Sequence, residues 1–271
     1  MIKITDGEFR LLSSYIKEHS GINLKNEKKT LLVGRLSSIL NELGIDNFMA
    51  YYKYLKNDTG GKELSRLIDK VTTNHTYFMR EPEHFNYFSQ IVLPYLKKTV
   101  TSRDLRIWCA ASSTGEEPYT LAILMADFFK NEEHLWDKKL LATDLSLSVL
   151  KEAQRGNYNN EKISLLPKIW VLNYFNKVGN NRYEIKDTLK KEVIFRRFNL
   201  LEPVFPFKKK LHVIFCRNVM IYFDNDTKNE LVEKMYDSLE YGGYLFIGHS
   251  ESIDRNKTRF KYVKPAVYRK L

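Results

Sequence analysis

The stretch Leu105–Pro118, LRIWCAASSTGEEP, decides the fold. It begins as a continuous apolar run, Leu105–Ala110, which is typical of a strand buried on both faces. Small residues follow and favour a tight turn, and the amphipathic stretch Pro118–Phe129 then predicts a helix. A buried strand, a turn of small residues and a helix form the repeating unit of a parallel sheet wrapped by helices.

The same alternation continues towards the C-terminus. Further strands are expected at Leu140–Thr143, Val193–Phe198, Leu211–Cys216 and Tyr244–Gly248, with helices at 146–155 and 225–240. Residues 257–270 predict a closing antiparallel pair broken at Pro265. Between about 173 and 198 the pattern also predicts a short polar hairpin, Arg182–Lys186 with Val193–Arg197. We therefore expect an α/β, Rossmann-like domain over 105–271 that carries a small antiparallel β insertion.

The N-terminal part predicts an all-α domain over residues 1–72. Thr5 or Asp6 can cap a helix that Gly21 ends, and a second helix fits 26–43 before Gly44. Two more helices fit 46–56 and 62–72. Residues 73–104 are interpreted as a linker that also forms a wall of the cleft between the two domains.

The composition excludes several classes of protein. Seventeen Tyr and 16 Phe among 271 residues are too many for a disordered protein. No run approaches the roughly 20 apolar residues of a membrane helix, and MIKITDGEFR is not a signal peptide. With two cysteines, Cys109 and Cys216, a disulfide scaffold is excluded, and we expect a cytoplasmic protein. The net charge of +11 favours a polyanionic partner.

The ends of the predicted strands carry the chemistry, because ligands bind at the carboxyl edge of such sheets. Ala110–Pro118 lacks the G-x-G-x-x-G pattern, and its two acids would repel a pyrophosphate and favour a cation. Asp144 could accept hydrogen bonds from ribose hydroxyls, and Asn199 could bind an adenine edge. Burying Arg217 and Asn218 in an apolar run would cost free energy unless their side chains are paired, which favours a binding site. The alternatives are a capping pair for the acids and a turn role for Asn199. A nucleoside and an ammonium together describe S-adenosylmethionine.

Five segments resemble the CheR-type chemotaxis methyltransferases, in the family's order. They are TNHTYFMREPEHF (73–85), WCAASSTGEEPYTLA (108–122), ATDLSLSVLKEAQRGNY (142–158), FNLL (198–201) and FCRNVMIYFD (215–224). The resemblance covers essentially the whole chain and includes the basic stretch KKTLLVGRL (28–36) of the N-terminal domain. It implies methyl transfer from S-adenosylmethionine to chemoreceptor glutamates, with S-adenosylhomocysteine as the product.

The resemblance also implies roles for single residues. Asn74, Thr76 and Arg80 would touch the cofactor, Glu117 would hold its ammonium and Asp144 its ribose. Asn199 and Leu200 would flank the adenine, and Arg217 and Asn218 would complete the pocket. Arg80 and Tyr222 would lie nearest the methyl group and act as catalytic residues. Lys28, Lys29 and Arg35 could lie along the acidic methylation helices of the receptors. A monomer without a metal is expected.

One departure from the family concerns receptor docking. Members that bind a pentapeptide at the receptor's C-terminus use a longer β insertion than the segment between Phe175 and Phe195, so we expect direct recognition of the methylation helices.

Two alternative functions differ from this one in class. A nucleic-acid methyltransferase would need an Asn-Pro-Pro-Tyr, Asp-Pro-Pro-Tyr or Pro-Cys motif, and none is present. A non-catalytic, cofactor-binding scaffold is disfavoured, because such a protein would be expected to have lost some of the pocket residues Arg80, Tyr222, Glu117 and Asp144. A methyltransferase that acts on another polyanionic substrate stays open as an alternative.

Overall fold

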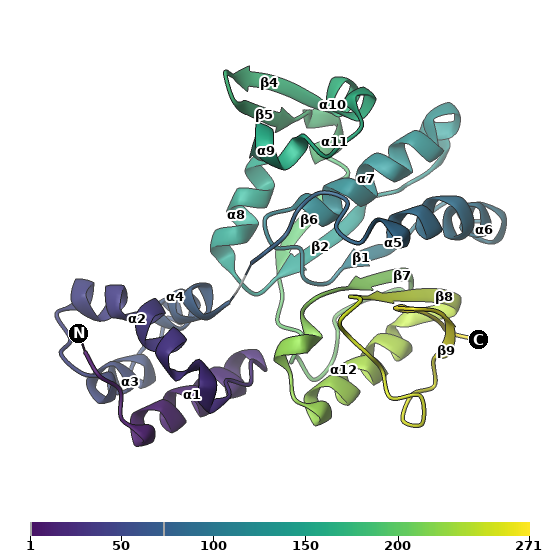
Figure 1. The fold of residues 1–271 in the computed structure, drawn as a ribbon. Helices are drawn as coiled ribbons and strands as arrows, with labels where there is room; N and C mark the ends of the chain where they lie inside the picture. The colour runs from purple at the N-terminus through teal and green to yellow at the C-terminus, as the bar shows by residue number, and fades with distance from the viewer. Residues whose placement is uncertain (1, 73) are drawn as a thin grey trace.

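The computed structural model describes residues 2–72 and 74–271. Thr73, the first residue of the expected linker, lies outside the described residues. Figure 1 shows a helical bundle at the N-terminal end, a twisted sheet flanked by helices, and a small β insertion at the top of the view. Among the described residues, no helix combines the length and the apolar character needed to cross a membrane.

The main sheet has seven strands in the order β6-β2-β1-β7-β8-β10-β9. Their bounds are β1 Ile107–Cys109, β2 Leu140–Asp144, β6 Val193–Arg197, β7 Leu211–Cys216, β8 Leu239–Ile247, β9 Lys261–Lys264 and β10 Val267–Arg269. All pairs from β6 to β8 are parallel, whereas β10 runs antiparallel to both of its neighbours. The strand order reverses between β1 and β7, which is where such folds bind ligands. The expected Rossmann-like architecture is confirmed.

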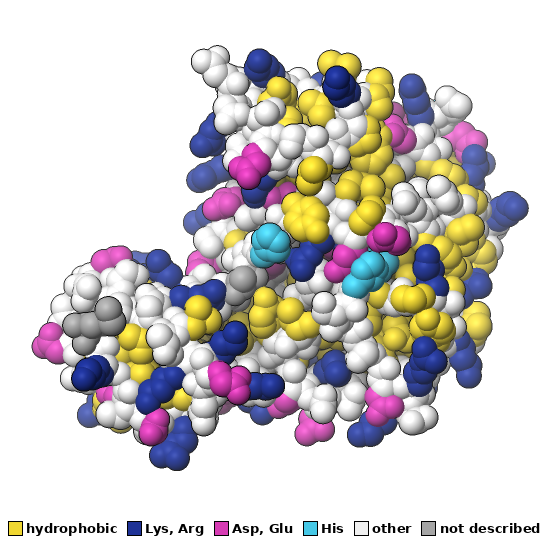
Figure 2. All heavy atoms as spheres, viewed as in Figure 1, with side chains coloured by type: hydrophobic (Ala, Val, Ile, Leu, Met, Phe, Trp, Pro, Cys, Tyr) yellow, Lys and Arg dark blue, Asp and Glu magenta, His cyan; other side chains and the backbone are white. Residues whose placement is uncertain are grey.

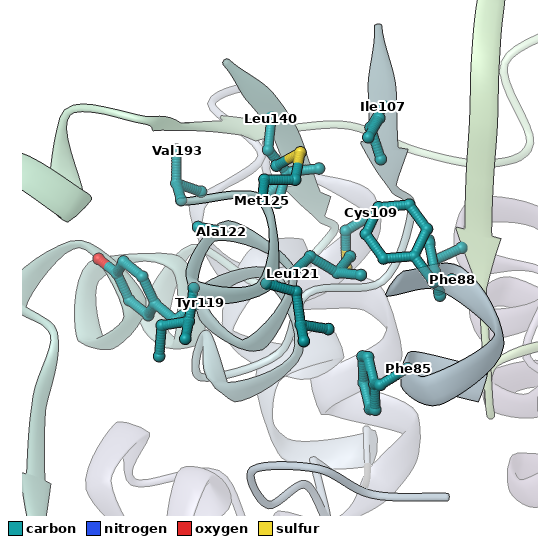
Figure 3. Close-up of a cluster of buried hydrophobic side chains, with 14 of the residues drawn as sticks. Phe85, Phe88, Ile107, Cys109, Tyr119, Leu121, Ala122, Met125, Leu140 and Val193 are labelled. Carbon is teal, nitrogen blue, oxygen red and sulfur yellow. The ribbon is translucent and has the colours of Figure 1, made fainter. Parts of the chain in front are cut away.

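Alternation along the strands divides the core between the two faces of the sheet. Ile107 and Cys109 of β1 belong to one apolar cluster, and Trp108 belongs to the other. Figure 3 shows the first cluster, in which Phe85 and Phe88 and side chains of α7 (Glu116–Phe128) pack against the strands. On the opposite face, α12 contributes Leu231 and Met235. Burial on both faces explains why the strands are continuous apolar runs.

The helices of the Rossmann-like half follow the expected strand–helix alternation. Their bounds are α7 Glu116–Phe128, α8 Leu147–Arg155 and α12 Asn225–Ser238, with short 3₁₀ turns η3 Lys130–Leu135 and η4 Met220–Tyr222. The segment expected as a linker is itself largely helical, with α5 Pro82–Tyr87, the π turn η2 Phe88–Val92 and α6 Leu93–Thr99. Phe85 and Phe88 of this helical segment are buried against the sheet.

The N-terminal bundle has its own apolar core. It consists of α1 Asp6–Ser20, η1 Asn26–Lys28, α2 Lys29–Leu43, α3 Phe48–Lys56 and α4 Lys62–Val71. Thr5 and Glu8 form a capping box at the start of α1, and Gly21 and Gly44 end α1 and α2 in the left-handed conformation. All four expected helices are confirmed to within two or three residues.

The pairing predicted for the β insertion is wrong. The small sheet has the order β3-β5-β4, with β3 Asn157–Asn159, β4 Phe175–Gly179 and β5 Arg182–Ile185. Its hairpin joins β4 to β5, whereas Val193–Arg197 is β6 and pairs with β2 in the main sheet. Three short helices complete the insertion and its connection to β6, namely α9 Asn160–Ile163, α10 Lys168–Tyr174 and α11 Asp187–Lys190.

Candidate active site

A cavity lies at the carboxyl edge of the main sheet, between the sheet and the bundle. Its empty volume, including the open solvent at its mouth, is about 960 Å³. Ser20, Ile22 and Val71 of the bundle form part of its wall. It is also lined by all ten residues expected for the cofactor and the methyl group, namely Asn74, Thr76, Arg80, Glu117, Asp144, Asn199, Leu200, Arg217, Asn218 and Tyr222. The structure thus brings together segments far apart in sequence, and the roles of these residues stay predictions.

Asp144 stands at the end of β2. Its Oδ2 accepts a hydrogen bond from the backbone N–H of Ser113 at 2.8 Å, and its Oδ1 accepts one from Ser146 at 3.0 Å. Burial raises the pKa of Asp144, and these backbone hydrogen bonds offset only part of that effect. Each carboxylate oxygen has a second lone pair, so the group can accept hydrogen bonds from two hydroxyls of a ligand.

The two adjacent acids at the start of α7 have different surroundings. Glu116 is fully buried, and its carboxylate binds Lys162 Nζ at 2.5 Å and accepts a hydrogen bond from Thr114 at 2.6 Å. Glu117 lines the cavity, where it accepts hydrogen bonds from Arg217 Nη1 at 2.6 Å and from Cys109 Sγ at 3.1 Å. Glu117 is therefore the acid that can reach a bound cation, and Glu116 stabilises the packing behind it.

Arg217 is the centre of the charged network. Its side chain is fully buried and binds Glu117 through Nη1 and Glu81 Oε2 through Nη2, at 2.6 and 3.0 Å. Nη2 also donates to the backbone carbonyl of Arg80, and the guanidinium lies 5.1 Å from the centre of the Phe85 ring. Burial alone would lower the pKa of Arg217, but the two carboxylates raise it. The expectation that this arginine is paired is confirmed.

Glu251 organises the loop that follows β7, and the sequence analysis did not single it out. Its carboxylate accepts hydrogen bonds from the backbone N–H groups of Asn218, Ile221 and Gly248, at 2.9, 3.2 and 2.6 Å. Asn218 has a φ of 58°, a strained value for a residue with a side chain. The only signal for Glu251 in the sequence is that an acid follows closely after the end of a buried strand, β8.

The expected catalytic residues, Arg80 and Tyr222, both line the cavity and come from different segments of the chain. Arg80 Nη1 donates to the carbonyl of His75 at 2.6 Å, and among the described residues Arg80 has no ion pair. The alternative pairing of Arg80 with Glu81 or Glu83 is therefore absent. Tyr222 is half-buried, and its backbone carbonyl accepts a hydrogen bond from Asn23 of the bundle at 2.8 Å. Both side chains reach the cavity from partly exposed positions.

Asn199 and Leu200 join the cavity to the bundle. The side-chain amide of Asn199 donates to the carbonyl of His19 at 2.9 Å, and its oxygen accepts the backbone N–H of Leu201 at 3.1 Å. Leu200 is buried and lines the cavity. One N–H of the Asn199 amide is left for a ligand, because the other is directed at His19.

Glu81 is a second residue that the sequence analysis missed as a site residue. Its carboxylate accepts hydrogen bonds from Arg217, from Asn218 Nδ2 at 3.1 Å and from the backbone N–H of His249 at 3.1 Å. Glu81, His84 and His249 are also the one group among the described residues whose potential metal-ligand atoms lie close together, within 4.8 Å. A cation there would compete with Arg217 for the carboxylate.

The three residues expected to bind a partner lie on the bundle, away from the cavity lining. Lys28 is exposed, and Lys29 forms an ion pair with Asp6 at 2.7 Å. The guanidinium of Arg35 donates to the carbonyls of Lys70, Val71 and Thr72 at the end of α4. Figure 2 shows Lys and Arg side chains spread over the surface of the bundle.

Comparison with known proteins matches both halves of the chain. Residues 74–269 match the family described as "CheR methyltransferase, SAM binding domain", and residues 7–72 match "CheR methyltransferase, all-alpha domain". A "Chemotaxis protein methyltransferase" of Borreliella burgdorferi is 43% identical over 99% of this chain and 96% of its own length. The protein of that name from Escherichia coli is 33% identical over 98% of this chain and 92% of its own length.

Proposed function

Because this chain belongs to the CheR methyltransferase family, a family of S-adenosylmethionine-dependent methyltransferases, we propose that it methylates glutamate side chains in the cytoplasmic methylation helices of chemoreceptors. The products are glutamyl methyl esters and S-adenosylhomocysteine. The observation that carries the proposal is the single cavity lined by Glu117, Asp144 and Arg80 together. We propose a cytoplasmic monomer with domain limits at 1–72, 73–104 and 105–271. The β insertion, expected at about 173–198, has a sheet formed by β3, β4 and β5, which pair with one another between residues 157 and 185.

The polar side chains that line the cavity fit S-adenosylmethionine. The Glu117 carboxylate would bind the ammonium, and the free lone pairs of Asp144 would accept the ribose hydroxyls. Asn199 and Leu200 would flank the adenine, while Asn74, Thr76, Arg217 and Asn218 would complete the pocket. The loop that leads into α7 ends in two adjacent acids and lacks the phosphate-binding glycine pattern, which disfavours a dinucleotide.

The bound S-adenosylmethionine supplies an electrophilic methyl group, and the substrate supplies the nucleophile. A glutamate has an ordinary pKa of about 4.3, so its carboxylate is already ionised at neutral pH and needs no general base. One carboxylate oxygen forms a bond to the methyl carbon while the carbon–sulfur bond breaks and its electron pair stays on sulfur. The work of the protein is to align these atoms and to exclude water.

Arg80 is suited to orient the incoming carboxylate, because its guanidinium lines the cavity without a carboxylate partner among the described residues. Tyr222, which also lines the cavity, would donate a hydrogen bond to the substrate or the cofactor. The negative charge of the substrate is neutralised during transfer, so strong ground-state binding by Arg80 would slow the reaction. Because Arg80 Nη1 donates a hydrogen bond to the His75 carbonyl, only the remaining N–H groups of the guanidinium are left for the substrate.

We propose direct docking of the receptor helices without a pentapeptide tether. The β4–β5 hairpin of the insertion is short, with a two-residue connection between Gly179 and Arg182. The surface offers positive charge on the bundle, including Lys28, for an acidic partner. Hydrophobic side chains are also exposed on the insertion, at the top of Figure 2, where Leu165, Ile169 and Leu172 are 68%, 58% and 72% exposed.

The test combines binding with methyl transfer. Titration calorimetry with S-adenosylhomocysteine comes first, followed by transfer of labelled methyl groups to receptor-containing membranes at saturating S-adenosylmethionine. Arg80→Ala should lower the methylation rate about 100-fold, because the acceptor is no longer aligned, and Tyr222→Phe about tenfold through one lost hydrogen bond. Arg10→Ala, an exposed position on α1, is the control. Binding without any methylation by the wild type would instead support a non-catalytic scaffold.

A further inference from the structure

We propose that Glu251 positions Asn218 and Tyr222 in the cavity and thereby supports methyl transfer, although Glu251 is not itself among the cavity-lining residues. This inference rests on the proposed function, in which Asn218 completes the cofactor pocket and Tyr222 donates a hydrogen bond to the substrate or the cofactor. Glu251 is a positioning residue in this role, because it acts through the backbone of the loop that follows β7.

The contacts of Glu251 are directed at the main chain. Its carboxylate accepts hydrogen bonds from the backbone N–H groups of Asn218, Ile221 and Gly248, at 2.9, 3.2 and 2.6 Å. The backbone N–H of Glu251 donates to the carbonyl of Gly248 at 3.0 Å, so a turn after β8 brings the acid back to the loop. Backbone N–H groups that converge in this way form a binding site for an anion, which the carboxylate of this chain fills.

The loop needs this support because its backbone is strained. Asn218 has a φ of 58°, in the left-handed region that costs free energy for a residue with a side chain. Gly248, at the end of β8, lies so close to the loop that a Cβ there would overlap the side-chain amide of Asn218. A strained conformation persists where the surrounding contacts determine it. Here Glu251 and the close approach of Gly248 supply those contacts.

Tyr222 depends on Glu251 through the short turn η4. Ile221, whose N–H donates to Glu251, belongs to the same 3₁₀ turn as Tyr222. The carbonyl of Tyr222 accepts a hydrogen bond from Asn23 of the bundle at 2.8 Å. The turn is thus held by Glu251 and by the bundle, and the half-buried ring of Tyr222 lines the cavity from it. Small displacements of a group that aligns reacting atoms lower the rate strongly, so the loss of one of these contacts should slow methyl transfer.

Asn218 is held by two acids in different ways. Its Nδ2 donates to Glu81 Oε1 at 3.1 Å, whereas its backbone N–H donates to Glu251. Because the amide nitrogen faces Glu81, the amide oxygen is left to accept a hydrogen bond from a ligand. Removal of Glu251 would leave the contact with Glu81 intact. We therefore expect cofactor binding to depend on Glu251 less than methyl transfer does.

The first measurement uses Glu251→Gln, which keeps the size of the side chain but replaces one accepting oxygen by an NH₂ group. The kcat of receptor methylation at saturating S-adenosylmethionine should fall about tenfold through the misplaced Tyr222. The affinity for S-adenosylhomocysteine should fall only about threefold, as for one weakened hydrogen bond. Glu230→Gln, the same substitution at an exposed position on α12, is the control. Denaturant unfolding shows whether each variant is folded. If Glu251→Gln is not, Glu251→Asp, which keeps the charge on a shorter side chain, replaces it in every test.

Two double-mutant cycles separate positioning from general damage to the protein. The kinetic cycle combines Glu251→Gln with Tyr222→Phe and measures kcat. The binding cycle combines it with Asn218→Gly and measures the affinity for S-adenosylhomocysteine by calorimetry. Glycine at 218 removes the amide but tolerates the left-handed backbone. In both backgrounds Glu251→Gln should have little further effect, because the side chain that it positions is already absent.

The outcomes separate this inference from the proposed function. Losses that add in the kinetic cycle would overturn the role of Glu251 towards Tyr222, and losses that add in the binding cycle would overturn its role towards Asn218. An unchanged kcat and affinity in Glu251→Gln would overturn both. If the wild type binds S-adenosylhomocysteine but methylates no receptor, the proposed function fails, while the binding cycle still tests the role of Glu251 towards Asn218.

Discussion

Asp144 combines two properties that bear on ligand binding. Its oxygens are oriented by the backbone N–H groups of Ser113 and Ser146, and its pKa is raised by burial above the ordinary 3.8. A carboxylate accepts hydrogen bonds better than a protonated carboxyl group. Binding that depends on Asp144 as an acceptor is therefore complete above its raised pKa and weakens as the pH falls through that value, earlier than for an ordinary aspartate.

Asp144→Asn should lower the affinity for S-adenosylhomocysteine by about 10- to 100-fold, since a buried charged acceptor is replaced by a group with one acceptor oxygen. The affinity of the wild type should decline on acidification towards pH 4, while that of the variant should stay nearly flat. Calorimetry across this pH range measures both effects. An equally steep pH dependence in the variant would assign the titration to another group. Asp46→Asn, at an exposed position between α2 and α3, is the control.

The sequence predicted which residues line the cavity better than it predicted which side chains those residues contact. Glu117, Asp144 and Arg217 were singled out by the resemblance to the CheR family, whereas the pattern alone left a capping role open for the acids. Spacing could not distinguish Glu117 from Glu116, because the difference depends on Lys162, which pairs with Glu116 from 46 residues further along. Glu81 was missed because its partner Arg217 lies 136 positions away, and no local pattern encodes that contact.

Among the helices of the bundle, α4 depends on a side chain from α2. Arg35 donates to three successive carbonyls, those of Lys70, Val71 and Thr72, at 3.3, 2.5 and 3.1 Å. The last carbonyls of a helix have no partner within it, so a cation there stabilises its end. Val71 and Thr72 also line the cavity, and Arg35 thus supports the cavity wall.

Lys28 and Arg35 should therefore behave differently when substituted. Arg35→Gln should lower the free energy of unfolding by about 2 kcal/mol through lost charge-assisted hydrogen bonds, whereas Lys28→Glu should leave it unchanged. Lys28→Glu should slow receptor methylation about fivefold at low salt and much less at 0.5 M salt, where exposed charges are screened. Denaturant unfolding and methylation at both salt concentrations test this. A salt-dependent loss of methylation by Arg35→Gln without destabilisation would place Arg35 on the docking surface instead.

Strands and long helices could be predicted because their patterns are local, but strand partners could not. Val193–Arg197 is a strand, as expected, yet its partner is β2 of the main sheet and not Arg182–Ile185. β3 has three residues, and α9, α10 and α11 have four to seven, too few for a hydrophobic period to emerge. The segment expected as a linker is helical from Pro82 to Thr99 and contains Pro94, which normally argues against a helix interior and is accommodated just after the π turn.

Across the whole molecule, the bundle forms part of the cavity. Asn23 donates to the carbonyl of Tyr222, Asn199 donates to the carbonyl of His19, and Lys17 forms an ion pair with Asp224 at 2.5 Å. A cleft between the two domains was expected from the sequence, but no bundle residue could be named as part of its wall, because that depends on how two separately folded cores dock. Cofactor binding and the position of the bundle should consequently be coupled.

A matched pair of glycine substitutions tests this coupling. Gly21 and Gly44 end α1 and α2 with φ values of 74° and 64°. A Cβ at Gly21 would lie 2.9 Å from Phe223, which lines the cavity, and 3.0 Å from Leu201, whereas a Cβ at Gly44 has no neighbour within 4 Å.

Both alanine variants should lose about 1–2 kcal/mol of stability from the left-handed backbone. Gly21→Ala alone should also reduce the affinity for S-adenosylhomocysteine, by about tenfold, because the added methyl group displaces Phe223 or pushes the bundle away from the cavity. Denaturant unfolding and calorimetry on both variants measure the two effects separately. Equal affinities would mean that the contact between the bundle and the sheet domain yields without disturbing the pocket. A loss confined to Gly21→Ala would show that the position of the bundle, which carries the proposed receptor-binding surface, also governs how tightly the methyl donor is held.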